Sequence, residues 1–261
     1  MKALIFSAGG AFGAYQAGVW QALEERGFRP DIVAGASIGA INATAVSRGA
    51  TGAQLQQWWR DPASDVFRWN WPPRGWGLLA SRPLEARIRK LLETLPQASP
   101  GLRLLVTLTE LPGTAIRVVA GENVTAQHLL ASCAIPVVFP AVRIEGRWYW
   151  DGGVFCRLPI GPAVEAGATE IIAVDLLAAP PSRPARGLLN AAIRTRRLLR
   201  GEKEETPPPR VKVRVIASRQ PLGSLRDLLR WDASNVQRWI EQGYRDAQQQ
   251  ADFRDFARLT P

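Results

Sequence analysis

The chain has 261 residues, of which 46% are hydrophobic, and it carries a formal net charge of +10 at pH 7. This length and apolar content predict one α/β domain or two small ones, and the positive charge keeps nucleic acid, an anionic membrane surface and an acidic ligand open as partners. Two cysteines and one histidine exclude a disulfide framework and a His-rich metal site. No apolar run reaches transmembrane length and no signal-peptide pattern begins the sequence. We therefore expect a soluble, cytoplasmic protein, and peripheral attachment to a membrane stays open.

A strand is predicted over residues 2–7, which are continuously apolar after the lysine, as in a central parallel strand. A glycine-rich turn over residues 8–13 follows, and residues 14–26 have the apolar spacing of a helix. The N–H groups of such a turn can bind a phosphate or an oxyanion. The turn is not a P-loop, and Ala8 in place of a first glycine gives a dinucleotide site only weak support. A plain turn is also consistent with this segment.

The next predicted strand, residues 31–34, leads into Gly-Ala-Ser-Ile-Gly at 35–39, and a helix is predicted over 38–47. A strand, a G-x-S-x-G turn and a helix in this order are the setting of a nucleophile elbow, which presents Ser37 Oγ at the top of a sheet. We expect glycine at positions 35 and 39 because strand and helix nearly touch there. The pattern alone is weak, and a tight turn with an idle serine is about as consistent with it.

Residues 51–80 are predicted to be irregular, because five tryptophans, three prolines and three arginines fall between positions 58 and 76. Such a segment suits a cap over an apolar site or a patch in a lipid interface. A loop whose tryptophans fold back onto the core is at least as consistent with the composition.

The second half of the chain alternates further strands and helices. A Pro-rich, basic stretch over about 180–210 interrupts it and is expected to be a surface excursion. His128 lies in a predicted helix, where an ordinary surface or packing role is expected. Helices are predicted over 84–95, 125–133, 159–166 and 224–259, strands over 102–109, 115–120, 170–176 and 211–217, and a hairpin over 141–144 and 147–150 around Glu145-Gly146.

Three segments together resemble the patatin-like phospholipase family. They are Ser-Ala-Gly-Gly-Ala-Phe-Gly-Ala-Tyr at 7–15, the Gly-Ala-Ser-Ile-Gly at 35–39, and Asp-Gly-Gly at 151–153, in the family's order; residues 131–136 also resemble it. The similarity covers about residues 2–177. It implies a single domain over 1–261 with a three-layer α/β/α fold, a mostly parallel central sheet and a nucleophile elbow.

The resemblance also implies a site and a reaction. Ser37 would be the nucleophile and Asp151 the base of a Ser-Asp dyad without a catalytic histidine, a metal or a cofactor. The expected activity is hydrolysis of a lipid acyl ester, such as a phospholipid or lysophospholipid. The oxyanion hole would come from the N–H groups of Gly9, Gly10 and Ala11, and the glycines of the motifs would be structural: Gly13, Gly35, Gly39, Gly152 and Gly153.

The chain departs from the family's usual pattern at three positions. Ala8 replaces the first glycine of the turn, Phe12 replaces a basic residue and removes a cation expected near the oxyanion hole, and Arg157 stands where asparagine is common. Because of these departures, a second function stays open. The chain could be a non-catalytic member of the same fold that binds lipid or an anionic membrane. Nucleic-acid binding would rest on charge alone, because no known nucleic-acid motif accompanies it, and none is expected.

Overall fold

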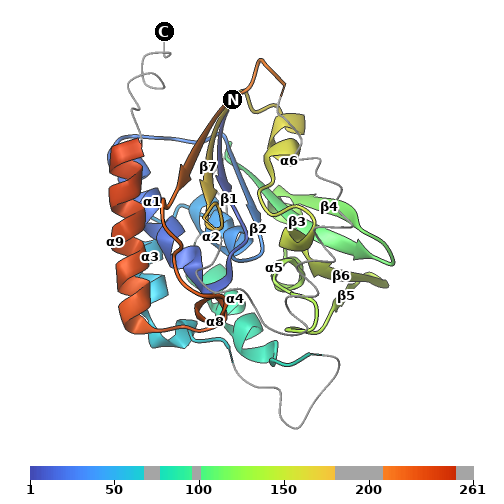
Figure 1. Cartoon of the computed structure of the whole chain (residues 1–261). Coiled ribbons are helices and arrows are strands. Elements are labelled where there is room, and N and C mark those ends of the chain that lie inside the picture. Colours follow the sequence, from blue (N-terminus) through green and yellow to red (C-terminus); the bar gives the residue numbers. More distant parts are fainter. Residues whose placement is uncertain (68–76, 96–100, 180–207, 251–261) are drawn as a thin grey trace.

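The structure is a computed structural model that describes residues 1–67, 77–95, 101–179 and 208–250 (Figure 1). In this part of the chain, eight strands form one sheet. They are β1 (Lys2–Phe6), β2 (Ile32–Ala36), β3 (Arg103–Leu111), β4 (Ala115–Ala120), β5 (Val142–Ile144), β6 (Arg147–Asp151), β7 (Glu170–Asp175) and β8 (Lys212–Ala217). The strand order is β5-β6-β3-β2-β1-β7-β8, and β4 pairs with β3.

The sheet is mixed, with a parallel half that confirms the predicted α/β class. Strands β3, β2, β1, β7 and β8 run parallel to one another, whereas β4, β5 and β6 pair antiparallel. The helices are α1 (Gly13–Glu25), α2 (Ile38–Ser47), α3 (Gly52–Arg60), α4 (Arg82–Thr94), α5 (Ala126–Ser132), α6 (Ile160–Glu165), α8 (Leu225–Leu228) and α9 (Ala233–Gln250).

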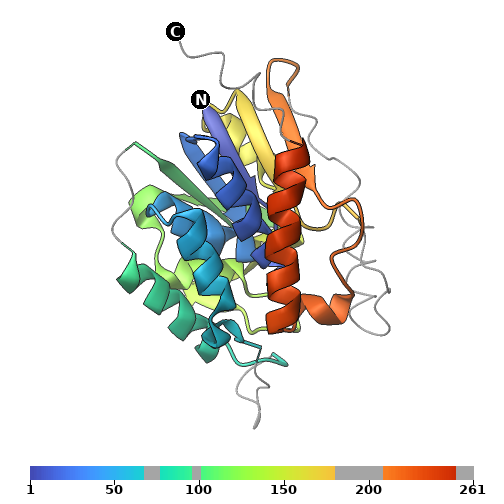
Figure 2. The ribbon, with the colours of Figure 1, turned by 90° about the vertical axis from the view of Figure 1, so that its left-hand side faces the viewer.

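Helices cover both faces of the sheet, and alternate residues of a strand feed the two cores. In β1, Leu4 and Phe6 belong to the larger apolar core, which α1, α2 and α9 also supply. Ala3 and Ile5 face the other way into a smaller core with Ala163 of α6. This period of two follows from the pleat of a strand. Figure 1 shows α1, α3 and α9 on one side of the sheet and α6 on the other, and Figure 2 shows α1 and α9 side by side, as their contacts require.

Strand β3 has one edge that two strands share. Its first half pairs with β2 and its second half with β6, because β4 occupies the opposite edge over both halves. Since β2 is parallel and β6 antiparallel to β3, the carboxyl ends of β2 and β6 meet head to head. Ala36 lies opposite Thr107, and Asp151 lies opposite the next residue, Leu108. The fold thereby brings position 37 to position 151 across a sequence separation of 114.

Two parts of the chain differ from the sequence prediction. Within the segment 51–80, which was expected to be irregular, residues 52–60 form α3, because a reciprocal capping box between Thr51 and Gln54 stabilises its first turn. The helix predicted over 224–259 is interrupted at 229–232, where Asp232 accepts the N–H of Asn235 and begins α9.

Some predictions lie outside the described residues. These are most of the basic excursion over about 180–210, the last part of the predicted C-terminal helix, and the tryptophans at 69, 71 and 76. Elsewhere the predicted hairpin is confirmed: Glu145 and Gly146 form its turn with φ angles of 48° and 84°, as a two-residue turn with left-handed backbone requires.

Candidate active site

Ser37 sits at the sharp turn between β2 and α2 with a backbone conformation that is rare for a residue with a side chain. Its φ is 55° and its ψ −129°, a strained combination that persists only where the surrounding structure enforces it. The turn is tight enough that a Cβ on Gly35 would lie 2.2 Å from the Gly39 carbonyl oxygen, and one on Gly39 would lie 2.3 Å from that of Phe6. Both positions therefore require glycine.

The strained turn directs the Ser37 hydroxyl at Asp151. Ser37 Oγ donates a hydrogen bond of 2.5 Å to Asp151 Oδ2, and both residues are buried, with exposed fractions of 4% and 2%. The second carboxylate oxygen, Oδ1, accepts the N–H of Gly153 at 2.6 Å. Asp151 thus caps the short 3-10 helix Gly152–Val154, and this bond fixes the carboxylate orientation that presents Oδ2 to the serine.

Ser132, at the end of α5, supports the elbow through a hydrogen bond to the Ser37 backbone. The sequence analysis did not identify this residue. Its Oγ accepts the Ser37 N–H at 3.0 Å and donates to the Thr107 carbonyl oxygen at 2.9 Å. Two residues on, the Ala134 carbonyl oxygen accepts the Asp151 N–H at 3.0 Å. The segment 132–134 therefore holds the backbone of both candidate catalytic residues. The sequence signal that pointed to this segment was the resemblance of residues 131–136 to the family, but it assigned no role to Ser132.

Cys133 lies between these two contacts, close to the reacting groups. Burial raises the pKa of its thiol well above the ordinary value, and the Asp151 charge raises it further, whereas a hydrogen bond with Ser37 opposes the shift. The side chain is therefore a neutral thiol at physiological pH. It packs beside the serine without the thiolate character that a cysteine nucleophile needs.

The glycine-rich turn after β1 packs against both other motifs. A Cβ on Gly13 would lie 2.6 Å from Ile38 Cγ1, and one on Gly153 would lie 2.3 Å from the Ala8 Cβ. Gly10 has a φ of 54°, in the left-handed region that favours glycine. Within the described part of the chain, the N–H groups of Gly9, Gly10 and Ala11 have no hydrogen-bond acceptor. The turn thus offers N–H donors next to the elbow, as an anion-binding turn would.

Two of the departures from the family pattern have structural explanations that leave this turn intact. Ala8 does not have a positive φ, and its methyl group lies in the space left by the missing side chain of Gly153. The Phe12 ring is buried and meets Trp239 of α9 edge to face at 5.0 Å between ring centroids. It therefore anchors the turn to α9.

Arg157, the third departure, also supports the turn. Its carbonyl oxygen accepts the Ala8 N–H at 2.9 Å. Its guanidinium forms two hydrogen bonds with Asp175, of which the one between Nη2 and Oδ2 is 2.9 Å long. The side chain that stands in place of asparagine thus ties the turn to the end of β7.

His128 lies at the opposite end of α5 from Ser132. Its Nδ1 accepts the N–H of Thr125 at 3.2 Å as part of a capping box, and burial lowers the pKa of the ring. The sequence analysis expected a surface or packing role for His128, and the structure gives it a capping role at the start of α5. Among the described residues, no three His, Cys, Asp or Glu side chains are grouped so that they could hold a metal ion.

The chain is similar to several known proteins. The family model described as "Patatin-like phospholipase" matches residues 4–164, which include the whole elbow, the Asp151 turn and the glycine-rich turn. Protein YqhO of Bacillus subtilis is 27% identical over 72% of this chain and 75% of its own length. An NTE family protein of Mycobacterium tuberculosis is 29% identical over 67% of this chain, but the match spans only 48% of that protein.

A longer relative and a solved structure extend the comparison. Patatin-like phospholipase domain-containing protein 7 of Rattus norvegicus is 25% identical over 67% of this chain, which corresponds to 13% of that protein. Among solved structures, VipD from Legionella pneumophila superposes with a TM-score of 0.50 over 95% of this chain and 66% of its own, at 15% identity. This likeness concerns the fold.

Proposed function

This chain belongs to the patatin-like phospholipase family, and on that premise we propose that it is a serine acyl-ester hydrolase acting on lipids through Ser37 and Asp151. The observation that carries the proposal is the 2.5 Å hydrogen bond between a strained, buried serine and a buried carboxylate. A nucleophile within hydrogen-bond reach of its base is the basic requirement of covalent acyl transfer.

In the proposed reaction, Ser37 Oγ attacks the acyl carbonyl carbon while its proton passes to Asp151 Oδ2. The carbonyl oxygen becomes an oxyanion, for which the N–H groups of Gly9, Gly10 and Ala11 are the proposed donors. The tetrahedral intermediate then collapses and its bond to the alcohol breaks. The alcohol takes the proton from Asp151 and departs, and an acyl-enzyme remains. Water then attacks, gives its proton to Asp151, and the fatty acid departs as Ser37 Oγ recovers that proton. Each donor of such an oxyanion hole contributes on the order of 3 kcal/mol to transition-state stabilisation.

Two exposed aliphatic side chains close to the site support a lipid substrate at an interface. Leu78 and Val137 are 54% and 55% exposed, and their backbones are joined by a hydrogen bond from the Leu78 N–H to the Val137 carbonyl oxygen. Val137 follows Ala134, which contacts Asp151, by three residues or at most about 11 Å of chain. A β-branched residue at a φ of 71° is a strained position, held with its side chain in solvent. We propose that this pair touches the lipid surface from which the substrate enters.

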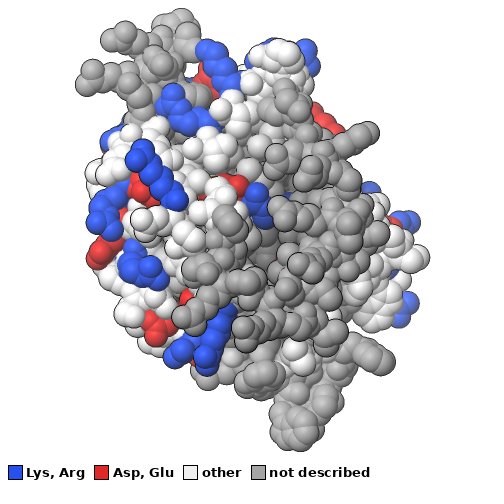
Figure 3. All heavy atoms as spheres, viewed as in Figure 1, with Lys and Arg blue, Asp and Glu red and all other residues white. Residues whose placement is uncertain are grey.

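The charges visible on one face of the molecule do not favour nucleic acid as the partner. On the face shown in Figure 3, the described Lys and Arg side chains are dispersed among Asp and Glu and do not form one stripe. The peripheral contact that we propose is with an anionic membrane. Among helices in the described ranges, none has both the length and the apolar character needed to cross a bilayer.

Ester hydrolysis by matched variants tests the proposal. We expect wild type and His128→Ala to hydrolyse a p-nitrophenyl acyl ester and long-chain phospholipids at similar rates, and Ser37→Ala to be inactive. A fluorophosphonate probe should label wild type at Ser37. If wild type is inactive and unlabelled while correctly folded, the chain is instead the non-catalytic lipid-binding member; if Ser37→Ala retains its rate, the dyad is wrong.

A further inference from the structure

A cleft of about 580 Å³ lies between α2, α3 and α4, away from the candidate active site. This volume falls within the range of roughly 300–1,000 Å³ that is typical of small-molecule sites. Its floor includes Ala45 and Ala50, whereas Ser37 precedes the first residue of α2. At a rise of 1.5 Å per residue, Ala45 is about 12 Å further along the helix than Ser37. The cleft is therefore a separate feature of the molecule.

The cleft is lined by both apolar and polar residues, which we call its apolar part and its polar part. The apolar part is lined by Leu55 of α3, by Leu91 of α4 and by Leu95, together with the two alanines of the floor. The charged residues of the polar part are three cations and one carboxylate: Arg60, Arg87, Lys90 and Asp61. A ligand that fills both parts must combine an alkyl chain with a polar end.

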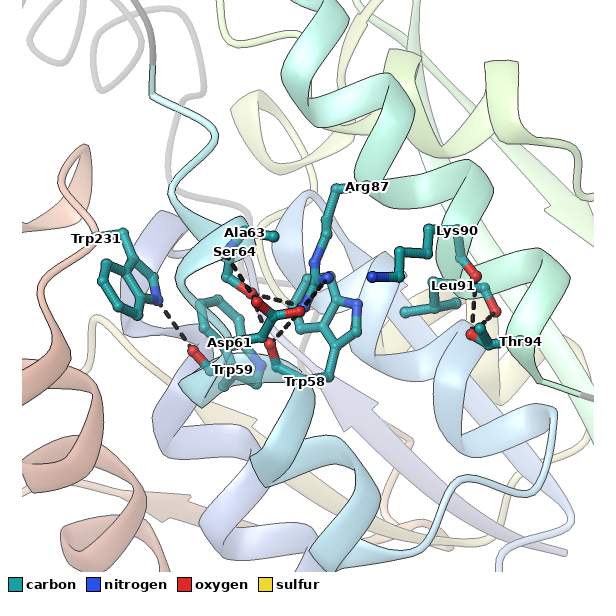
Figure 4. A network of polar contacts seen from close by, with 10 residues as sticks. All are labelled: Trp58, Trp59, Asp61, Ala63, Ser64, Arg87, Lys90, Leu91, Thr94 and Trp231. Carbon is teal, nitrogen blue, oxygen red and sulfur yellow. Dashed lines mark hydrogen bonds and ion pairs between the residues drawn. The ribbon is translucent and has the colours of Figure 1, made fainter.

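Arg87 organises the polar part, and Figure 4 shows it between Asp61 and the Trp58 ring. Its Nη1 donates to Asp61 Oδ2 at 2.8 Å and its Nη2 to the Trp58 carbonyl oxygen at 2.7 Å, and the guanidinium carbon lies 4.6 Å from the Trp58 ring centroid. The side chain is only 4% exposed. These hydrogen bonds use the two terminal nitrogens of Arg87 and do not involve its Nε–H.

Two buried N–H groups in this part of the cleft have no acceptor among the described residues. They are Arg87 Nε and Trp58 Nε1. Leaving a buried donor without a partner costs about 1–3 kcal/mol, so native proteins keep few such groups. Both residues line the cleft, so the two unsatisfied donors belong to side chains of its wall.

Asp61 does not supply that acceptor, because neither N–H is hydrogen-bonded to its carboxylate, whose oxygens accept other donors. Oδ1 accepts the Ala63 N–H at 2.9 Å and Oδ2 accepts Arg87 Nη1. The hydrogen bond from Ala63, with that from Arg87, holds the pKa of this carboxyl below its ordinary value, so it stays ionised. Lys90, whose charge also acts on Asp61, extends in Figure 4 from α4 toward the Trp58 indole and is exposed at the rim. The two unpartnered buried groups are thus both donors, and Lys90 adds a cation.

We propose that this cleft binds a fatty acid, with its alkyl chain along Leu55, Leu91 and Leu95. Its carboxylate accepts hydrogen bonds from Arg87 Nε and Trp58 Nε1 and forms an ion pair with Lys90. The choice of a fatty acid rests on the proposed function, because hydrolysis of a lipid acyl ester releases one. The geometric requirement, an acyl chain with an anionic end, is independent of that function.

Calorimetric titration of the full chain in a Ser37→Ala background tests the site, because that variant converts none of the ligands. Three ligands are compared below the micellar range: laurate, methyl laurate and acetate. We expect laurate to bind saturably at one site, and methyl laurate and acetate to bind at least tenfold more weakly. Equal binding of methyl laurate would overturn the proposal, since the polar part would then contribute nothing, and so would the absence of laurate binding.

Single substitutions assign the binding to this cleft. Lys90→Gln and Trp58→Phe should each weaken laurate at least fivefold, whereas Lys212→Gln, which removes an exposed lysine at the start of β8, should leave it unchanged. Equal weakening by Lys212→Gln, or no weakening by the first two, contradicts the assignment. Thermal unfolding of each variant verifies folding.

The two proposals fail separately. With Ser37 intact, Lys90→Gln should hydrolyse p-nitrophenyl acetate at the wild-type rate. An inactive wild type would refute the proposed function without altering a laurate affinity measured by calorimetry.

Discussion

The surroundings of Ser37 and the cleft between α3 and α4 are built from the same local element but are completed differently. Asp151 and Asp61 each accept a backbone N–H two residues ahead and begin a short 3-10 helix, Gly152–Val154 and Pro62–Ser64. Asp151 uses its other oxygen for a hydroxyl, whereas Asp61 uses it for the Arg87 guanidinium. The same turn thus supports a reacting pair in one place and a fixed ion pair in the other.

The polar groups around Ser37 and Asp151 and those around Arg87 also differ in how far they are satisfied. Around the elbow, the Ser37 N–H, the Ser132 hydroxyl and both Asp151 oxygens have partners within the protein. In the cleft, the Arg87 Nε–H and Trp58 Nε1–H have none. Groups that partner one another are preorganised for chemistry, while unpartnered donors suit a ligand that supplies the acceptor. Substitutions in each region test whether partnered and unpartnered groups have these different consequences.

The largest difference is expected between Asp151→Asn and Asp61→Asn. Loss of the proposed base should lower kcat for ester hydrolysis by at least about 10³-fold, because an amide cannot take the Ser37 proton. Asp61→Asn should leave kcat within about twofold of wild type, since this residue touches no reacting group. Steady-state kinetics of both variants provide the measurement. A comparable loss of kcat in both would mean that the two aspartates act alike, through folding.

The next effect concerns the contact between Ala8 and Gly153. A Cβ at position 153 would lie 2.3 Å from the Ala8 Cβ and 2.9 Å from Asp151 Oδ1. Gly153→Ala should therefore destabilise the fold by about 1–3 kcal/mol and lower activity. Adding Ala8→Gly should restore part of the stability, because it removes the closer clash. Denaturant unfolding of the two single variants and the double variant gives the coupling energy; strictly additive effects would show that the two positions do not touch.

A smaller effect is expected from Ser132→Ala, which leaves the Ser37 N–H buried without its acceptor. The free energy of unfolding should fall by about 1–3 kcal/mol, and kcat should fall about tenfold with little change in KM, because the elbow is no longer held in register with Asp151. Ser64→Ala, which removes a buried hydroxyl bonded to Trp58 and Arg87, serves as the matched control and should lower stability alone. A similar fall of kcat in both variants would reduce Ser132 to a general packing role.

The smallest expected effects concern how the free energy of unfolding depends on pH in the two regions. The pKa of Cys133 is raised from about 9.0 by burial, so the folded state keeps a proton that the unfolded state loses; its contribution to stability is present below that value and decreases as pH rises. The pKa of Asp61 is lowered from 3.8, chiefly by the Ala63 N–H, so its contribution is present above 3.8 and lost as pH falls through the folded pKa. Cys133→Ala should flatten the alkaline side of the stability profile and Asp61→Asn the acidic side. Urea titrations across pH provide the measurement, and unchanged profiles would contradict these directions.

Much of the fold could be predicted from local patterns. The elbow needed only a buried strand, two glycines and a helix in sequence, and the hairpin needed Glu145-Gly146 between two short strands. Helix α3 was missed because Trp58, Trp59 and Pro62 dominated the composition of its region, although Thr51 and Gln54 carried a readable cap. The interruption before α9 was missed because Asp232 was not considered as a helix start.

The site could be predicted only in part, for a different reason. The proposed roles of Ser37 and Asp151 came from motifs in order along the chain, whereas their proximity depends on strand pairings between distant segments. Ser132 was not identified because a serine at the end of a helix has no sequence feature that reports a bond to the backbone at position 37. The cleft residues Trp58, Arg87 and Lys90 come from two helices whose packing no local pattern specifies.

The shared edge of β3 has a consequence for biosynthesis. Ser37 leaves the ribosome early, but the strand that delivers its partner is the sixth to be made and docks against the second half of β3. Until that docking, the nascent chain has a serine without a proton acceptor. The proposed hydrolytic activity therefore requires this docking. If the proposed function holds, the time at which a refolding chain first reacts with a fluorophosphonate would report the docking of β6 on β3.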